Sequence, residues 1–525
     1  MRPGGKILLR RNFRVSHEEL TINHSHEHMR DVFVRMESNH YLPKGTPGHG
    51  TDGYFDTNMS NGTQYKLRPA MLEVMKAEVA LLGDDPEKIV EYLGRDGNYK
   101  SETRAQDTGM FGLAFHATAG WERWSSRTYI LRTLNAKNED GSKKYPLTLS
   151  TNSLATKLIW GTANDPKCKD SILPCVTAVQ YLKGEALYAA DARHSGNETG
   201  KPMLAYAKKD VIVSGGTFNS PQLLQLSGIG DKAHLQELGV DAKVHRPGVG
   251  ANLMDNQEVP IVGNVRVAIE TLAVPGEPTC APGQAGDPCL ELLRENNTGP
   301  YTRQGPNANA LLLKTAHAVR DERDIFIFSL PGAFRGFWPA VQQADLADPP
   351  STVGLSMVKI HPQNHQGYVR ITTADPLVQP EINFEYYAEG GETDLGALQD
   401  AVAFGRTAFG NVAAPYGPVE PVEPPCKRGP DAKGYCGKDD EDWIRYQTFG
   451  HHPTGTCKMG AADDEMAVVD SEFRVIGVQG LRVVDASIFP ETPGAFPVVA
   501  TVMISLKASD AILKGAEKGK RVDRF

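Results

Sequence analysis

Apolar residues recur every three to four positions in four stretches of the chain, and this period predicts helices there. The first stretch is HEHMRDVFVRME (26–37), whose apolar residues fall on one side of a helix. The next two are RPAMLEVMKAEVALL (68–82) and ETDLGALQDAVAFGRTAF (392–409). A long fourth helix is predicted to begin near Val499, in VATVMISLKASDAILKGAEK.

Short runs of β-branched and apolar residues lie between these stretches and predict strands. One is LTLSTNSLATKLIW (147–160), and another is the buried-type run VIV at residues 211–213. The segment 256–449 is mixed and includes the alternating run GYVRITTA, and LRVVDA (481–486) follows it. Strands therefore alternate with helices, which indicates an α/β or α+β fold.

A glycine turn joins the run at 211–213 to the next predicted helix, in VIVSGGTFNSPQLLQLSGIG. Ser220 is the expected N-cap of that helix, Pro221 its first residue and Gly228 lies near its C-cap. Gly215 and Gly216 would let the backbone approach a cofactor or another segment closely. GIGDKA, which begins at Gly228, has G-x-G-x-x-A spacing but follows a helix instead of a strand, so it predicts a helix end and no dinucleotide site.

Composition places the chain among ordinary globular proteins of two domains or more, with 525 residues, 40% hydrophobic and 23% charged. The net charge of −8 disfavours nucleic acid or an anionic membrane as the main partner. No run of about 18 apolar residues predicts a membrane span. The first residues, MRPGGKILLRRNF, lack the apolar core and cleavage site of a secretory signal.

Six of the seven cysteines form three local pairs, Cys168 with Cys175, Cys280 with Cys289, and Cys426 with Cys436. Each pair brackets a short segment with Pro, Gly or Asp, a pattern that fits disulfides closing loops in an oxidising compartment. Reduced cysteines are the alternative, and zinc would prefer tighter spacing. Five N-x-[ST] sequons are compatible with secretion: Asn23, Asn58, Asn61, Asn197 and Asn296. The chain therefore has a secretory or extracellular character without a visible signal.

The segment with the most candidate catalytic residues close together is FGHHPTGTCKMG (449–460), which contains His451 and His452. Adjacent side chains do not converge on one ion, and no third ligand is near, so no metal site is predicted. Two interpretations stay open on these residues alone: a catalytic base, because imidazole titrates near neutral pH, or a histidine buried in the core.

Four blocks of the chain resemble, in order, those of the glucose–methanol–choline (GMC) oxidoreductases, flavoenzymes that dehydrogenate alcohols. These blocks are GGTFNSPQLLQLSGIG (215–230), HRPGVGANLMDN (245–256), GHHPTGTCKMG (450–460) and LRVVDASIFPETPGAFPVVATVMISLKASDAIL (481–513). The resemblance extends from about residue 27 to about 515. It implies a two-domain flavoprotein fold with a discontinuous FAD-binding domain and a mixed-sheet substrate domain, and FAD as cofactor.

The resemblance also assigns roles to residues. His452 matches the active-site histidine, which takes the hydroxyl proton while hydride leaves the carbinol carbon for the flavin. The positions that match flavin or adenine contacts are Ala155, Ala486, Pro497 and Val498. The implied substrate is a small-molecule alcohol, with secondary metabolism as one setting, and the electron acceptor is oxygen or another compound.

One departure from the family concerns the second polar residue that hydrogen-bonds the substrate oxygen. The family has His or Asn where this chain has Phe496, and a phenyl ring can neither donate nor accept the proton. His451 could take that role, a substrate group could, or one histidine could suffice. Phe496 alternatively only shapes an apolar substrate pocket.

A second departure is that the family's opening strand and G-x-G-x-x-G loop have no match, and the first 26 residues resemble nothing in the family. A truncated chain is the expectation, with weakened FAD affinity. The expected parts are an unmatched segment 1–26, a cap or substrate-side part 27–109, an FAD-binding part 110–255, a substrate-binding domain 256–449, and a C-terminal FAD-binding and active-site part 450–525. The alternatives are a non-catalytic remnant of the family and a non-redox isomerase or cyclase on the same scaffold.

Overall fold

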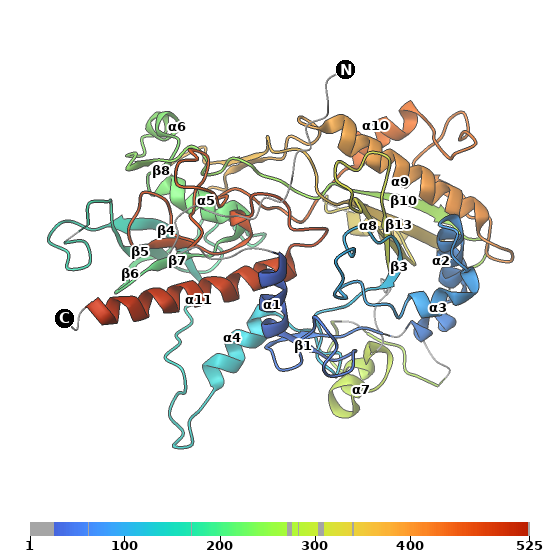
Figure 1. Ribbon diagram of the computed structural model, residues 1–525, viewed down its shortest axis with the longest axis horizontal. Coiled ribbons are helices and arrows are strands. Elements are labelled where there is room, and N and C mark those ends of the chain that lie inside the picture. The colour runs from blue at the N-terminus through green and yellow to red at the C-terminus, as the bar shows by residue number, and fades with distance from the viewer. Residues whose placement is uncertain are drawn as a thin grey trace.

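The elements of the chain gather into two lobes, which lie left and right in Figure 1. A computed structural model describes residues 26–60, 62–169, 171–269, 276–281, 283–302, 309–338 and 341–522. Among these residues, no helix is long and apolar enough to cross a membrane. The first segment expected from the sequence, 1–26, lies almost wholly outside the described residues.

The right-hand lobe, here the large-sheet lobe, is built on a six-stranded sheet. Its strand order is β16 (Glu420–Glu423), β10 (Glu258–Asn264), β13 (Thr352–Lys359), β12 (Ile325–Leu330), β11 (Asn309–Leu313) and β3 (Gly109–Gly112). All neighbouring strands in it run antiparallel.

The two faces of this sheet pack against different partners because side chains alternate along a strand. Ile325 and Ile327 of β12 face a core that includes α2 (Pro69–Leu81) and α9 (Gly391–Asn411). Phe326 and Phe328 belong instead to a second cluster, which is joined by Phe334 and Ala495. Those two residues come from outside the sheet, so the second face is the one that turns toward the histidines described below.

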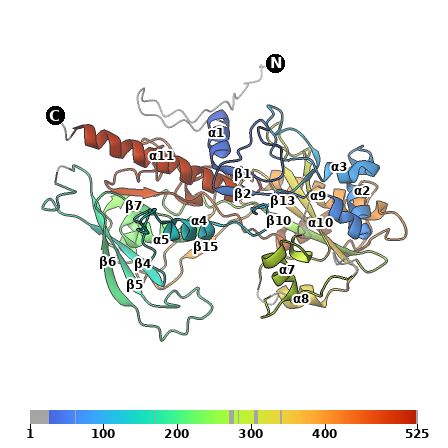
Figure 2. The same ribbon diagram turned by 90° about the horizontal axis from the view of Figure 1, so that it is seen from below.

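The left-hand lobe, here the small-sheet lobe, has sheets of two or three strands around one core. β4 (Ser153–Trp160), β5 (Val176–Lys183) and β6 (Lys201–Tyr206) form an antiparallel sheet, which lies at the lower left of Figure 2. β7 (Val211–Val213) pairs parallel with β17 (Leu481–Val483). α5 (Gly216–Leu226) and α11 (Val498–Val522) pack on these strands, and segments far apart in sequence thus share one core.

The remaining elements connect or cover the two lobes. α1 (His26–Met36) packs on α11, where Arg35 makes a two-pronged ion pair with Asp510 at 2.8 and 3.1 Å. The other helices and strands are α3 (Ile89–Tyr92), α4 (Ser126–Asn135), α6 (Lys232–Glu237), α7 (Pro288–Asn296), α8 (Val341–Ala347), α10 (Lys438–Gln447), β1 (Glu37–Asn39), β2 (Phe55–Thr57), β8 (Ile229–Gly230), β9 (Val244–His245), β14 (Tyr368–Arg370) and β15 (Glu381–Asn383).

The helices predicted from periodicity are confirmed within one or two residues, as α1, α2, α9 and α11. The strand predicted at 147–160 is shorter and begins at Ser153. The predicted start of the helix after the glycine turn is wrong. α5 begins at Gly216, and Pro221 lies inside it. Proline removes one backbone N–H from the helix, and the carbonyl that this leaves free, Thr217 O, accepts a bond from Thr456 at 2.6 Å instead.

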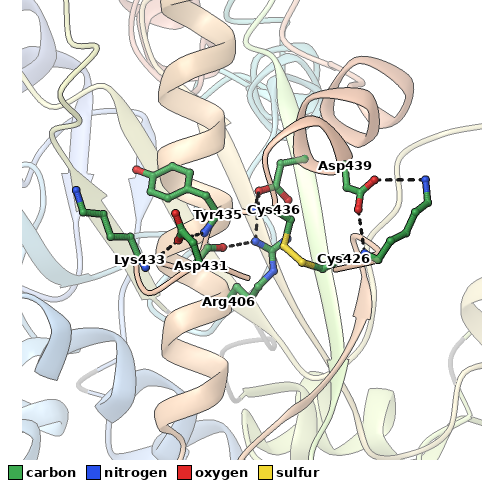
Figure 3. Close-up of a disulfide and its surroundings, with 10 residues drawn as sticks. Arg406, Cys426, Asp431, Lys433, Tyr435, Cys436 and Asp439 are labelled. Carbon is green, nitrogen blue, oxygen red and sulfur yellow. Dashed lines mark hydrogen bonds and ion pairs between the residues drawn. A yellow bond between two sulfur atoms is a disulfide. The ribbon is translucent and has the colours of Figure 1, made fainter. Parts of the chain in front are cut away.

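The three predicted cysteine pairs are disulfides: Cys168–Cys175, Cys280–Cys289 and Cys426–Cys436. The last one closes the loop between β16 and α10 and lies beside a buried ion pair between Arg406 and Asp440 at 2.6 Å, and Figure 3 shows Arg406 next to that disulfide. The backbone N–H of Cys436 also bonds Asp440, at 2.6 Å. Cys457 is a buried free thiol.

Candidate active site

The two histidines lie on a short loop that runs beside the segment before β10. Residues 449–457 are here named the histidine loop. Its first residue, Phe449, exchanges two backbone hydrogen bonds with Glu258, at 2.9 and 3.1 Å. Thr454, five residues further along the loop, exchanges two with Met254, at 2.9 and 3.0 Å. The chain between these two anchor points carries His451 and His452, so both rings are held on a fixed piece of backbone.

The other end of the histidine loop is bound to the small-sheet lobe. Thr217 Oγ1 donates to Pro453 O at 2.7 Å, in addition to the bond from Thr456 to the carbonyl of Thr217. Gly455 N donates to Ala486 O at 3.3 Å. Gly455 has φ +98°, and a Cβ there would lie 2.2 Å from Asn252 O, so only glycine fits this turn. The loop is therefore tied to three separate segments of the chain.

His452 is almost completely buried, and its ring nitrogen Nδ1 has no hydrogen-bond partner within the described residues. Its ring centroid lies 4.1 Å from that of His451 and 4.9 Å from that of Phe496. Burial, assisted by the neighbouring His451, lowers the pKa of His452 to about 3. The imidazole is thus neutral over the physiological pH range and can accept a proton.

His451 is more open and has a different environment, with 29% of its side chain exposed. Its Nε2 lies 3.3 Å from Glu258 Oε2. Three phenyl rings surround it with centroids 5.0 to 6.1 Å away, those of Phe334, Phe337 and Phe449. Burial lowers its pKa as well. His451 therefore combines a carboxylate on one side with an apolar wall on the other.

Two buried carboxyl groups, Asp255 and Glu258, lie behind the histidines. Asp255 accepts the backbone N–H of His452 at 2.8 Å and the hydroxyl of Tyr386 at 3.1 Å. Glu258 accepts the hydroxyl of Ser356. Burial raises the pKa of both carboxyls to about 7, and Asp255 adds to the rise at Glu258. Sequence reasoning missed this pair, because its one local signal, two acids just before an apolar run in MDNQEVP, is equally typical of an ordinary strand end.

Phe496, from the block 481–513, lies at the edge of the site next to His452. It is 38% exposed, and its ring lies edge-on to Phe326 of β12 at 4.9 Å. Phe337, which is 64% exposed, has its ring centroid 5.0 Å from that of His451. The structure thus brings together His451, His452 and Phe496, with exposed phenyl rings at two edges of the group.

The four positions expected to contact the cofactor fall into three places. Ala486 begins a short 3₁₀ helix (Ala486–Ile488), and its carbonyl is the one bonded by the histidine loop. Pro497 and Val498 follow Phe496 directly, and Val498 is the first residue of α11, whose first N–H groups have no partner within a helix. Val498 is 49% exposed. Ala155 is exposed on β4, in the sheet on which α5 packs.

These residues fit a flat aromatic cofactor next to His452. The surface at Phe496 to Val498 is apolar and exposed, and Ala486 is small. A Cβ on Gly216 would meet no atom within 4 Å, so the turn after β7 is open to a close neighbour. Asp485 holds that turn, accepting bonds from Gly216 N at 3.0 Å and from Ser220 Oγ at 2.5 Å. Among the described residues, no cluster of His, Cys, Asp and Glu could hold a metal ion.

Comparison with protein families and curated proteins finds the same group of flavoenzymes. Models of GMC oxidoreductase match residues 176–258 and 362–505. An oxygen-dependent choline dehydrogenase of Staphylococcus saprophyticus is 33% identical over 314 residues, which are 58% of this chain and 50% of that protein. One of Rhizobium etli is 31% identical over 393 residues, 71% of this chain and 64% of that protein. The chain spans about half the length of the first of these relatives.

Solved structures support the fold. Pyridoxine 4-oxidase from Mesorbium loti superposes with a TM-score of 0.64 at 19% identity, over 93% of this chain and 77% of that one. Formate oxidase from Aspergillus oryzae RIB40, in a study of FAD modification, gives 0.67 at 18% identity, over 93% and 78%. At such identity the likeness concerns the fold, which is the two-domain mixed α/β fold of these proteins.

Proposed function

The chain belongs to the GMC oxidoreductase family, whose cofactor is FAD, and we propose that it oxidises an alcohol with His452 as the catalytic base. The observation that carries this proposal is the neutral imidazole of His452, held by the histidine loop beside the apolar surface of Phe496 to Val498. A base must be unprotonated before it can take a hydroxyl proton, and burial keeps His452 in that form.

The residues proposed to hold the cofactor are Ala486, Pro497 and Val498 near the reacting ring and Ala155 at the adenine end. FAD supplies the hydride acceptor for the carbinol carbon. The protein's own contribution is to fix the alcohol between His452 and the phenyl rings, and to exclude water from the side where Phe496 meets Phe326. His451 is the proposed second polar group at the substrate oxygen, because Phe496 cannot be one.

The exposed phenyl rings favour an alcohol that presents an apolar surface. Phe337 and Phe496 flank the histidines and are both partly open to solvent. An apolar substrate face would cover them and remove that area from water, at about 25 cal/mol for each Å². The electron acceptor, oxygen or another compound, is left open by this arrangement.

A second candidate is an acid–base reaction without net redox chemistry, such as an isomerisation or cyclisation. Two histidines and two carboxyl groups lie together here. Burial raises the pKa values of the carboxyls and lowers that of His452, so a carboxyl can give a proton where the imidazole can take one. Flavin that stays oxidised while an alcohol is converted would favour this candidate.

The proposed localisation is the secretory pathway or the cell exterior. Three disulfides support an oxidising compartment. Asn197 and Asn296 are exposed and could carry glycans, whereas Asn58 is buried and donates to Thr118 O at 2.9 Å. Asn23 and Asn61 lie outside the described residues. Mass spectrometry of the secreted protein would find glycans at Asn197 or Asn296 and none at Asn58.

The test of the activity is anaerobic reduction followed by absorption. Purified protein should release flavin with a band at ~450 nm, and a substrate alcohol should bleach that band. His452→Ala should keep the flavin but lower the rate of bleaching by about 10²–10⁴-fold, the contribution of a general base. His317→Ala, a half-exposed histidine elsewhere, is the control. A colourless folded protein, or a His452→Ala variant that bleaches at the normal rate, would refute the proposal.

A further inference from the structure

Glu258 is a buried carboxyl that the proposed reaction does not yet use. It is the first residue of β10 and is fully buried. One oxygen, Oε1, accepts the hydroxyl of Ser356. The other, Oε2, accepts no hydrogen bond from the described residues and lies 3.3 Å from His451 Nε2. A buried acceptor without a bond is costly, so its orientation toward an imidazole at the site calls for an explanation.

The backbone fixes this orientation. Glu258 is paired on one side with Phe449, two residues before His451, through both of its backbone groups. On its other side it lies opposite Val358 of β13, so this first residue of β10 is paired on both sides. A carboxyl on backbone that is paired on both sides cannot move far, whereas the imidazole needs only a small rotation to close the 3.3 Å contact. Such contacts are often loose before substrate binds.

On the basis of the proposed function, we propose that Glu258 and His451 form a second acid–base pair, in which Glu258 positions His451 to bind the substrate oxygen. Glu258 Oε2 and His451 Nε2 share one proton, which fixes the tautomer, so the ring's own hydrogen lies on Nδ1 and that N–H is left to donate to the substrate oxygen. The pair thereby supplies the polar partner that Phe496 cannot provide. His451 is the catalytic residue of the pair, and Glu258 acts through it.

The charges around the pair support one shared proton. Burial raises the pKa of Glu258 to about 7 and lowers that of His451, so both buried groups favour their uncharged forms and a proton on the carboxyl can be shared with Nε2 of the imidazole. The other titratable groups that face Glu258 are Asp255 and Tyr386. Asp255 already accepts the backbone N–H of His452 and the Tyr386 hydroxyl, so it competes little for His451.

The first test reads the imidazole directly and needs no turnover. In full-length protein with ¹⁵N-labelled histidine, a pH titration follows the His451 signal, assigned by its loss in His451→Gln. Glu258→Gln keeps the shape and the bond from Ser356 but removes the charge. It should lower the pKa of His451 by about one unit, since a nearby carboxylate favours imidazolium. An unchanged titration would overturn the proposal.

The matched control is Glu78→Gln. Glu78 is also a fully buried carboxyl, it accepts a serine hydroxyl (Ser329 at 3.0 Å), and it contacts the same sheet on the face away from the histidines. Its replacement should leave the His451 titration where it is. A shift of equal size in Glu78→Gln would mean that any buried charge in this lobe moves the signal, and the proposed pairing would be rejected.

The second test uses the pH profile of kcat/KM. Glu258→Gln should lower kcat/KM by about tenfold or more, which is a typical effect of losing an oriented hydrogen-bond donor. It should also shift the pH at which kcat/KM rises on the acid side of the profile. In a His451→Gln background the same change should have no further effect, because the two residues act as a unit. Additive losses would overturn the pairing. Turnover that survives His452→Ala would refute the proposed base instead, while the imidazole titration still decides the pair.

Discussion

Two buried histidines in this molecule have opposite environments, and their comparison shows what burial alone does. His49, near the N-terminal side, lies between Glu37 at 3.0 Å and Asp96 at 2.9 Å. Among the described residues, the Nδ1 atom of His452 in the histidine loop has no hydrogen-bond partner, and its backbone N–H donates to Asp255. Burial acts on both, but the carboxylates at His49 outweigh it and raise the pKa to about 9, whereas the pKa of His452 falls to about 3.

The difference separates a structural histidine from a reactive one. An imidazole that stays protonated at neutral pH between two carboxylates holds three segments together, and in that form it has no lone pair to offer. A neutral imidazole is costly for stability below its ordinary pKa but can take a proton. The imidazole of His49 therefore carries a charge that stabilises the fold. The imidazole of His452 stays neutral, next to the surface proposed for flavin and alcohol.

The largest effect on stability is expected at His49. Changing it to Gln leaves Glu37 and Asp96 facing each other without a cation, and breaking a buried ion pair from one side typically costs about 3–5 kcal/mol. Urea unfolding of His49→Gln should show a loss of this size. His452→Gln, the matched change at the other histidine, should lose less than about 1 kcal/mol. Equal losses would mean that the carboxylates do not distinguish the two sites.

The pH dependence of stability should have opposite signs at the two histidines. For His49 the folded pKa is raised to about 9, so its contribution is complete below pH ~6.5 and is lost as pH rises toward 9. The size is about 3 kcal/mol by linkage. For His452 the folded pKa is lowered to about 3, so the unfolded chain gains its proton first and stability falls as pH drops from ~6.5 toward 3.

Comparing each variant with the parent protein isolates the pH-dependent contribution of each histidine to stability. Free energies of unfolding should be measured from pH 4 to 9.5. The parent protein should lose stability on the alkaline side, and His49→Gln should not show that loss. On the acid side, His452→Gln should lose less stability than the parent. A His49→Gln curve parallel to that of the parent above pH 6.5 would show that His49 is not charged in the folded state.

The sequence predicted the regular elements better than it predicted the site. Periodicity located α1, α2, α9 and α11 because each buries one face in its own lobe. It failed at α5, because the bond that uses the carbonyl freed by Pro221 comes from Thr456, 239 residues away along the chain. No local pattern contains that partner.

The residues of the site also divide into those that the sequence predicted and those that it did not. His451, His452 and Phe496 were predicted from the resemblance, and the fold places the ring of His452 4.1 Å from that of His451 and 4.9 Å from that of Phe496. Asp255 and Glu258 went unnoticed as members of it, since an acid before an apolar run is typical of an ordinary strand end. Their role emerges only when β10 pairs with the histidine loop, a contact between segments nearly 200 residues apart.

The smallest expected effect concerns Phe496, and it tests whether the site tolerates a second polar group. Phe496→Asn would remove the edge-on contacts with Phe326 and His452, which are worth about 1 kcal/mol of stability beyond buried area. It would also place an amide where the substrate oxygen is proposed to lie. If His451 with Glu258 already fills that role, kcat should change by less than about tenfold while KM for an apolar alcohol rises, since apolar contact is lost. A large gain in kcat would instead show that the site lacks a second hydrogen-bond donor, and that His451 does not supply it.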